Sequence, residues 1–176
     1  LWSQYREGRL TKEILRIKRF EETFSHFGIH NTEVVKNFES QYLSNAPLEK
    51  AMFPQTLEVL SYLKEKGYHM FLLTNGFKEV QDIKIRSTGL IDYFEHMFTS
   101  DEIGYQKPHR KIFEHAIKSV NAKKKQSLMI GDDWHIDIEG ARKFGIDQVF
   151  FNPEMVKTEG KSTYQIAQLA DLKLFL

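Results

Sequence analysis

Hydrophobic positions in the first 48 residues recur with a helical period. Five of them are spaced three or four residues apart, which places them on one helix face: Ile14, Ile17, Phe20, Phe24 and Phe27. Thr11 suits the N-cap of this helix and Gly28 its end. A second helix is predicted to follow Asn31 or Thr32, either of which suits its N-cap, and to be broken at residues 45–47. Residues 1–48 therefore predict a small helical segment whose aromatic side chains form the seam of a bundle.

After Pro54 the pattern changes to short apolar runs that alternate with helical periods. Strands are predicted at residues 68–73, 96–99, 128–130 and 147–151. Helices are predicted at residues 56–67 with Thr56 as the cap, 78–87, 108–120, 136–145 and near the C-terminus from residue 169, with loops at 100–106 and 152–162. This alternation predicts right-handed crossovers and a parallel sheet flanked by helices, an α/β core over residues 54–176.

The strongest chemical signal follows the apolar strand Leu128–Ile130. The strand stops at Gly131, and three carboxylates follow within six residues: Asp132, Asp133 and Asp137. Ligands of open α/β sheets bind beyond the carboxyl ends of the strands, where these acids are expected. Their mutual repulsion is relieved by a cation, and hard oxygen ligands suit Mg2+. An Asp at a helix start is also a common cap, an interpretation that remains open for Asp137 taken alone.

Two further polar groups are expected at the same edge of the sheet. Thr74, Asn75 and Gly76 follow one predicted strand, and Lys107 precedes a proline at the start of a helix. A hydroxyl, free backbone amides, a lysine and a metal-binding carboxylate together suit a phosphoryl group, which carries negative charge on three oxygens. Taken singly, Thr-Asn-Gly is an ordinary turn and Lys107 an ordinary solvated side chain.

Composition narrows the possible classes of function. The chain has 176 residues, 41% of them hydrophobic and 28% charged, and a net charge of +1. This balance lacks the basic footprint of a nucleic-acid-binding protein, so no nucleic-acid partner is expected. The absence of Cys excludes disulfides and thiolate metal sites. No apolar run approaches the roughly 20 residues that span a bilayer and none resembles a signal peptide, so we expect a cytoplasmic protein, monomeric or weakly dimeric, without a membrane partner.

Three ordered motifs resemble those of the haloacid dehalogenase-like hydrolases. LLTNG at 72–76, Lys-Pro at 107–108 and IGDDxxxD at 130–137 look like motifs II, III and IV of that superfamily, in order and in spacing. The resemblance covers residues 54–176 and implies a Rossmann-like three-layer core. Residues 1–48 look like the later helices of its α-helical C1 cap. The sequences at 74–81 and 131–141 are similar to the branch that includes pyrimidine 5'-nucleotidase-like phosphatases.

The resemblance also implies a role for each candidate acid. Asp132 would coordinate Mg2+, and Asp137 would support the metal waters or orient Lys107. Asp133 stands where many relatives carry a small polar residue, and it is predicted as a further metal residue. The family's nucleophile is the first Asp of a DxDxT motif, which this sequence does not contain. We expect that motif upstream of Leu1, on a central strand between the strands ending at residues 73 and 130.

The implied reaction is hydrolysis of a phosphomonoester through a phosphoaspartate. Thr74, Asn75, Gly76 and Lys107 would bind the transferring phosphoryl group, with Thr74 and Lys107 acting in catalysis. The expected substrate is a small phosphorylated metabolite such as a nucleoside 5'-monophosphate. A phosphomutase, a haloacid dehalogenase of the same fold and a non-catalytic binding or regulatory protein remain alternatives.

Overall fold

The computed structural model describes all 176 residues, which form two compact units. The helical unit consists of Leu1–Lys50 and Val80–Thr88, and the sheet unit consists of Ala51–Glu79 and Gly89–Leu176. Each unit has its own buried side chains.

The helical unit begins with three α-helices and a short 3₁₀-helix: α1 (Trp2–Arg6), α2 (Lys12–His26), α3 (Thr32–Asn45) and η1 (Ala46–Leu48). Both predicted caps are confirmed. Thr11 Oγ1 accepts a hydrogen bond from the amide of Ile14 at 3.4 Å, and Asn31 Oδ1 accepts one from Glu33 at 2.9 Å. Each cap satisfies an amide that the first helical turn would otherwise leave unpaired.

The predicted aromatic seam joins α2 to α3. The rings of Phe20 and Phe38 meet edge-on with centroids 5.3 Å apart, and those of Phe24 and Phe38 lie 5.1 Å apart. Leu15 of α2 and Val35 of α3 are buried. Edge-on aromatic pairs at these distances are attractive beyond the area that they bury. The seam therefore accounts for Phe20 and Phe24, whereas Phe27 is 74% exposed.

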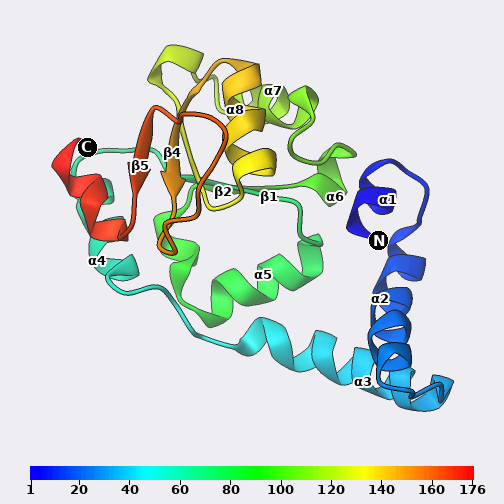
Figure 1. Ribbon diagram of the computed structural model, residues 1–176. Coiled ribbons are helices and arrows are strands. Elements are labelled where there is room, and N and C mark those ends of the chain that lie inside the picture. The colour runs from blue at the N-terminus through cyan, green and yellow to red at the C-terminus, as the bar shows by residue number, and fades with distance from the viewer. The chain divides into compact units, whose positions relative to one another are not determined.

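The sheet unit contains five short strands, all paired in parallel (Figure 1). They are β1 (Phe71–Thr74), β2 (His96–Thr99), β3 (Leu128–Gly131), β4 (Asp147–Phe151) and β5 (Tyr164–Ile166). They form two sheets, in the orders β1-β2 and β3-β4-β5. The predicted α/β class with parallel strands is confirmed, and β1 and β3 each have an edge that pairs with no other strand.

Helices alternate with these strands along the chain. The α-helices are α4 (Thr56–Glu65), α5 (Lys78–Ser87), α6 (Ser100–Ile103), α7 (Arg110–Ser119) and α8 (Glu139–Phe144). The shorter elements are the 3₁₀-helices η2 (Leu90–Tyr93), η3 (Lys124–Gln126) and η5 (Leu169–Leu174) and the π-helix η4 (Trp134–Ile138). None of the helices combines the length and the apolar character that crossing a membrane requires.

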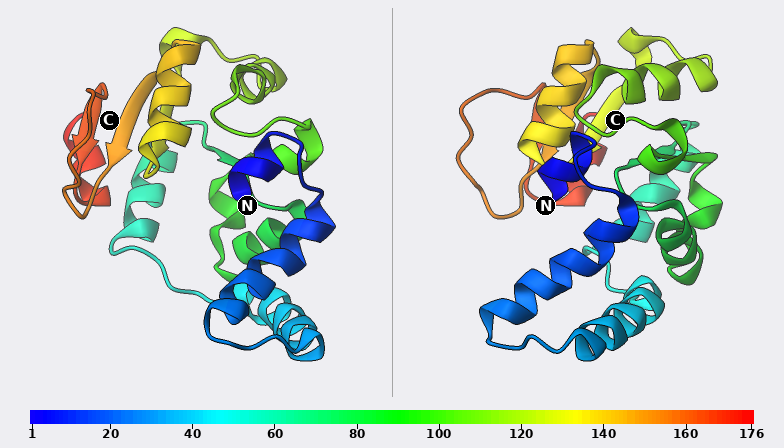
Figure 2. Two further views of the ribbon diagram at one scale, coloured as in Figure 1. Left: turned by 45° about the vertical axis from the view of Figure 1, so that its right-hand side comes forward. Right: turned by 90° about the vertical axis from the view of Figure 1, so that its right-hand side faces the viewer.

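Side chains from the two faces of the β3-β4-β5 sheet enter different cores. Figure 2 shows the ribbon of α8, coloured yellow, beside that of β4, coloured orange. Val149 and Phe151 of β4 pack with Val59 and Leu63 of α4, whereas Phe150 between them packs with η4. A second core joins α7 to α8 and holds Ile112, Phe113, Ala141, Phe144 and Ile146. The alternation along β4 follows the two-residue period of a strand and gives the layered arrangement expected of an α/β core.

Some local predictions were wrong. Thr56 is the first residue of α4, and the N-cap is Gln55. The Thr56 hydroxyl donates to the carbonyl of Phe53 at 2.7 Å instead of accepting from an amide of the first turn. Residues 100–103 form α6 inside the predicted loop, and the C-terminal helix is a 3₁₀-helix. β5 was not predicted, since its three residues are too few to show a period.

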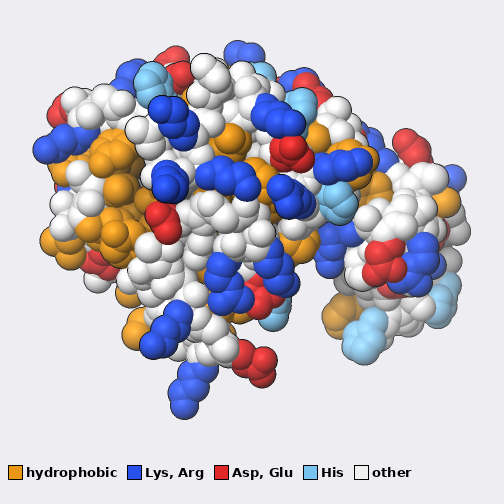
Figure 3. Space-filling model, turned by 90° about the horizontal axis from the view of Figure 1, so that it is seen from above, with side chains coloured by type: hydrophobic (Ala, Val, Ile, Leu, Met, Phe, Trp, Pro, Cys, Tyr) orange, Lys and Arg blue, Asp and Glu red, His pale blue; other side chains and the backbone are white.

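Figure 3 shows charges of both signs on the face that it draws, with Lys and Arg side chains among uncharged and hydrophobic surface. This mixture fits a chain with 25 basic and 24 acidic residues. Charged side chains of opposite sign therefore share this face with apolar surface.

Candidate active site

A groove of about 1340 Å3 opens in the sheet unit and is lined by residues of both β1 and β3. Residues 71–73 of β1 and 128–131 of β3 line it together with Lys107, Asp132 and Asp137. Lys107 and the two acids come from separate segments of the chain. The predicted convergence of a lysine and carboxylates at the ends of the strands is therefore what the structure shows.

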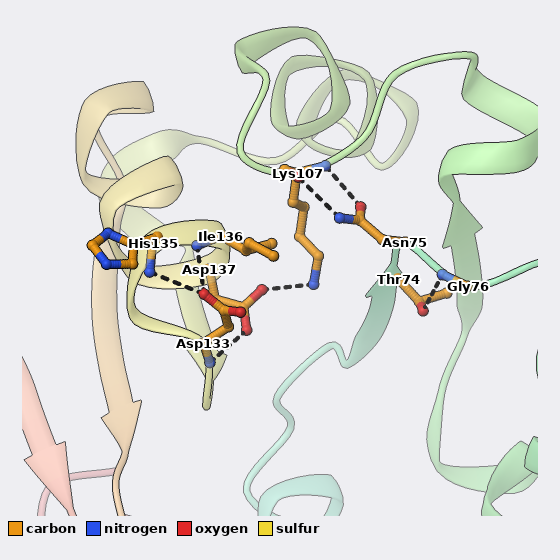
Figure 4. Close-up of polar contacts among 8 residues, drawn as sticks. All are labelled: Thr74, Asn75, Gly76, Lys107, Asp133, His135, Ile136 and Asp137. Carbon is orange, nitrogen blue, oxygen red and sulfur yellow. Dashed lines mark hydrogen bonds and ion pairs between the residues drawn. The ribbon is translucent and has the colours of Figure 1, made fainter. Parts of the chain in front are cut away.

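The segment Gly131–Asp137, here called the acid turn, leads from β3 into η4. Asp133 caps η4, since its Oδ1 accepts hydrogen bonds from the amides of His135 at 3.0 Å and Ile136 at 2.8 Å (Figure 4). A carboxylate at this position also suits the positive end of a helix. The Asp133 side chain therefore caps η4, a role that the sequence analysis left open only for Asp137.

Asp137 and Lys107 form a buried ion pair. Lys107 Nζ lies 2.7 Å from Asp137 Oδ1, and the two side chains are 11% and 7% exposed. Asp137 Oδ2 accepts a hydrogen bond from the amide of Asp133 at 3.2 Å. Oδ1 has no well-aligned hydrogen bond, so its contact with Lys107 is mainly ionic. The pair holds the ammonium group at the groove, where it keeps two further N–H groups that can donate to a ligand.

Gly131 makes room for this carboxylate. A Cβ at residue 131 would lie 2.4 Å from Asp137 Oδ2 and 2.5 Å from Asp137 Cβ. Contacts this short do not occur between real side chains, so only glycine lets Asp137 approach the end of β3 in this way. Gly140, nine residues after Gly131, has a similar role. A Cβ at residue 140 would lie 2.9 Å from Pro108, the neighbour of Lys107. Sequence reasoning missed both requirements.

Asp132 differs from the other two acids. Its side chain is exposed, lines the groove and makes no hydrogen bond or ion pair with the rest of the chain. Its oxygens are free to bind a cation. No group of three or more His, Cys, Asp or Glu side chains is arranged around a possible metal position. The residues present therefore fit a magnesium ion only in part, with Asp132 as the available carboxylate.

The segment Thr74–Gly76, here called the neutral turn, leads out of β1. Thr74 Oγ1 accepts a hydrogen bond from the amide of Gly76 at 3.0 Å, which leaves the hydroxyl proton available for a ligand. Asn75 Oδ1 accepts from the amide of Lys107 at 2.7 Å, and Asn75 Nδ2 donates to the carbonyl of Lys107 at 2.9 Å. Figure 4 shows Lys107 between this turn and Asp137.

The residues at and just after the end of β2 make structural contacts with the neighbouring helices. Thr99 Oγ1 caps α6 by accepting from the amide of Glu102 at 3.3 Å, and Glu102 pairs with Lys78 at 3.1 Å. Desolvation raises the pKa of Glu102, but hydrogen bonds from Thr99 and Lys78 outweigh it and leave the pKa below its usual value. Asp101 Oδ2 accepts from the amide of Lys78 at 3.4 Å. These contacts join the start of α5 to α6.

Comparison with known proteins identifies relatives among hydrolases. The haloacid dehalogenase-like hydrolase family matches residues 4–145. The pyrimidine 5'-nucleotidase PynA of Streptococcus pneumoniae is 31% identical over 179 residues, which cover 98% of this chain and 73% of PynA. A glyceraldehyde 3-phosphate phosphatase of Methanothermobacter thermautotrophicus is 36% identical over 107 residues, 61% of this chain and 47% of that enzyme.

Solved structures show the same fold. The HAD-hydrolase YfnB of Bacillus subtilis, whose crystal structure is bound to magnesium, superposes with a TM-score of 0.87 at 24% identity. The superposition covers 98% of this chain and 75% of YfnB. The structural likeness extends over both the helical residues and the strands.

Proposed function

Because the chain belongs to the haloacid dehalogenase-like hydrolase family, we propose that its protein is a magnesium-dependent phosphomonoester hydrolase acting through a phosphoaspartate. The observation that carries the proposal is the placement of a buried Lys107–Asp137 pair and an exposed, unpaired Asp132 on one groove. A lysine held beside a free carboxylate is the arrangement that a phosphoryl group and its cation require.

We propose that the nucleophilic Asp lies on a strand outside residues 1–176 that pairs between β1 and β3. Both strands line the groove, and each has an unpaired edge there. Ile130 of β3 is 37% exposed, whereas its register partner Val149 in β4 is fully buried. Side chains of parallel strands are normally buried, partly by the side chains of the neighbouring strand on the same face. The exposure of Ile130 therefore supports a further strand at this edge of β3.

Two side chains would bind the phosphoryl group. Thr74 would donate its hydroxyl proton to one oxygen, and the free N–H groups of Lys107 would neutralise the charge that develops on another. The aspartyl oxygen would form a bond to phosphorus as the bond from phosphorus to the leaving oxygen breaks, and the second Asp of the DxDxT motif would donate the proton that turns the leaving group into an alcohol. Water would then cleave the aspartyl phosphate, releasing inorganic phosphate and restoring the carboxylate.

Asp132 would hold the cation. Bound Mg2+ would supply charge that stabilises the transferring phosphoryl group. Asp137 would act through Lys107, because one of its oxygens contacts the ammonium group and the other accepts from the backbone. Asp133 would serve η4 as its cap, since two amides occupy Oδ1. This division keeps one of the three predicted acids as a direct metal ligand.

We propose a small phosphorylated metabolite as the substrate, with nucleoside 5'-monophosphates the first class to test. One relative, whose match covers 98% of this chain, is named a pyrimidine 5'-nucleotidase. Another, whose match covers 61% of this chain, is named a glyceraldehyde 3-phosphate phosphatase. Sugar phosphates are therefore the second class to test.

The decisive assay measures phosphate release by the full-length protein on both substrate classes, with Mg2+ and with EDTA. We expect release that depends on Mg2+ and that falls at least about 10³-fold in Asp132→Ala, because the metal loses its free carboxylate. Release that persists in EDTA or in Asp132→Ala would contradict the mechanism. Chloride release from a 2-haloacid without phosphate release would favour the dehalogenase alternative.

Asp133→Ser is the matched variant for the neighbouring acid. Serine is also a good helix cap but carries no carboxylate. If Asp133 only caps η4, the Mg2+ concentration that gives half-maximal activity stays within about twofold of that of the unsubstituted protein. A rise of tenfold or more in that Mg2+ concentration, which corresponds to about 1.4 kcal/mol of binding free energy, would indicate that Asp133 binds the metal.

A further inference from the structure

The side chain of Asn75 binds the backbone of Lys107 and of no other residue. Its oxygen accepts from the Lys107 amide at 2.7 Å and its nitrogen donates to the Lys107 carbonyl at 2.9 Å. The two residues are 32 positions apart, so the contact joins the end of β1 to the loop before α7. Both hydrogen bonds together fix the position and the orientation of one peptide segment.

Lys107 is thereby held at both ends. Asn75 fixes its backbone, and Asp137 fixes its ammonium group at 2.7 Å. Without these contacts the bonds of the Lys107 side chain would rotate more freely, and that conformational entropy would be lost each time that a substrate binds. The hydrogen bonds that Asn75 makes to the backbone use its amide oxygen and one of the two N–H groups of its amide nitrogen.

We infer that Asn75 is a positioning residue, which fixes the backbone of Lys107 so that the ammonium group faces the transferring phosphoryl group. This inference rests on the proposed function for the role of Lys107 itself. To the expected binding of phosphate by residues 74–76 it adds a role in which the Asn75 side chain acts through Lys107.

The chain contains a matched control. Asn152 follows β4 as Asn75 follows β1, and it makes the same pair of hydrogen bonds. Its Oδ1 accepts from the amide of Val156 and its Nδ2 donates to the carbonyl of Val156, each at 2.9 Å. Asn152 is 3% exposed and does not line the groove. Asn152→Ala therefore breaks an equivalent contact away from Lys107.

The first test compares kinetics of the full-length protein. Asn75→Ala is expected to lower kcat about 10- to 100-fold with KM changed less than about threefold, because a small displacement of a reacting group lowers turnover strongly. Asn152→Ala is expected to keep kcat within about twofold while lowering the urea midpoint of unfolding comparably. A raised KM at unchanged kcat in Asn75→Ala would indicate direct substrate contact and overturn the inference.

A double variant separates action through Lys107 from independent action. If Asn75 acts only through Lys107, adding Asn75→Ala to Lys107→Ala lowers kcat by less than about twofold. If the double variant lowers kcat by the product of the two factors measured for the single variants, the inference is overturned. Should Asn75→Ala fail to fold, Asn75→Asp keeps the acceptor for the Lys107 amide and loses the donor, so an intermediate fall in kcat is expected.

Hydrogen exchange tests the contact without any activity. The Lys107 amide is expected to exchange at least about tenfold faster in Asn75→Ala and at an unchanged rate in Asn152→Ala, with the reverse at Val156. An unprotected Lys107 amide in the unsubstituted protein would overturn the inference. Absence of phosphate release from the unsubstituted protein would instead reject the proposed function, and the exchange rates would still show whether Asn75 holds Lys107.

Discussion

The acid turn and the neutral turn both follow parallel strands and both reach Lys107, yet they are built differently. In the acid turn, Asp137 lies against Gly131 at a distance that excludes a Cβ, and its charge is buried with that of Lys107. In the neutral turn, Thr74 and Asn75 use only hydrogen bonds to backbone groups. One turn is fixed by steric fit and buried charge, and the other by uncharged polar contacts.

The difference predicts where substitutions will be felt. A buried charge that loses its partner, or a close contact that becomes a clash, costs several kcal/mol of folding free energy. A hydrogen bond between neutral groups contributes only about 0.5–1.5 kcal/mol. Changes to the acid turn should therefore appear first in stability, and changes to the neutral turn first in turnover.

Asp137→Asn should have the largest effect on stability. It removes the charge that compensates Lys107 inside the protein, and we expect the free energy of unfolding to fall by about 3–5 kcal/mol. Urea denaturation would measure the change. Glu139→Gln is the control, because Glu139 pairs with Arg142 and Lys143 at the surface and exposed pairs contribute about 1 kcal/mol or less. Equal losses in the two variants would show that burial does not distinguish the pairs.

Gly131→Ala should come second, with a loss of about 1–3 kcal/mol from overpacking. The added Cβ pushes Asp137 away from β3 and lengthens its contact with Lys107. Gly160→Ala creates a clash of similar size, 2.7 Å from the ring of Trp134, a side chain that takes no part in the ion pair. Thermal unfolding would compare their stabilities. Phosphate release should fall only in Gly131→Ala, and an equal fall in both would refute the steric explanation.

Thr74→Val should have the smallest effect on stability, about 1 kcal/mol or less, because it removes one hydrogen bond from the Gly76 amide. Its effect on kcat should be larger, about tenfold or more, since the hydroxyl donor to the phosphoryl group is lost. Thr74→Ser keeps the hydroxyl and should retain most of the turnover. A large loss of stability in Thr74→Val with normal turnover would remove the distinction between the two turns.

The hydrophobic pattern predicted the elements that carry the site. The run Leu128–Ile130 gave β3 within one residue, and residues 147–151 gave β4 with both bounds correct. Helical periods and caps predicted α2 and α3 in the same way. The helix predictions succeeded because burial of one face imposes a period on the sequence, and the strand predictions succeeded because burial of both faces leaves a short continuous apolar run.

Contacts between distant segments could not be predicted from the sequence. Nothing near Asn75 indicates that its partner is the backbone of Lys107, and nothing near Gly131 indicates that Asp137 will fold back onto it. The cap role of Asp133 was available from local sequence, since Asp before a helix is a common cap, but its position between two acids favoured a metal role.

The π-helix after β3 has a consequence for how this segment can change by insertion or deletion. In η4 the carbonyl of Asp133 accepts from the amides of both Asp137 and Ile138, so the turn holds one residue more than an α-helical turn. Removing one residue would rotate Asp137 by about 100° around the helix axis, away from Lys107. The exposed His135 can be replaced by other residue types. A change in the number of residues between Gly131 and Asp137, in contrast, would break the ion pair between Asp137 and Lys107.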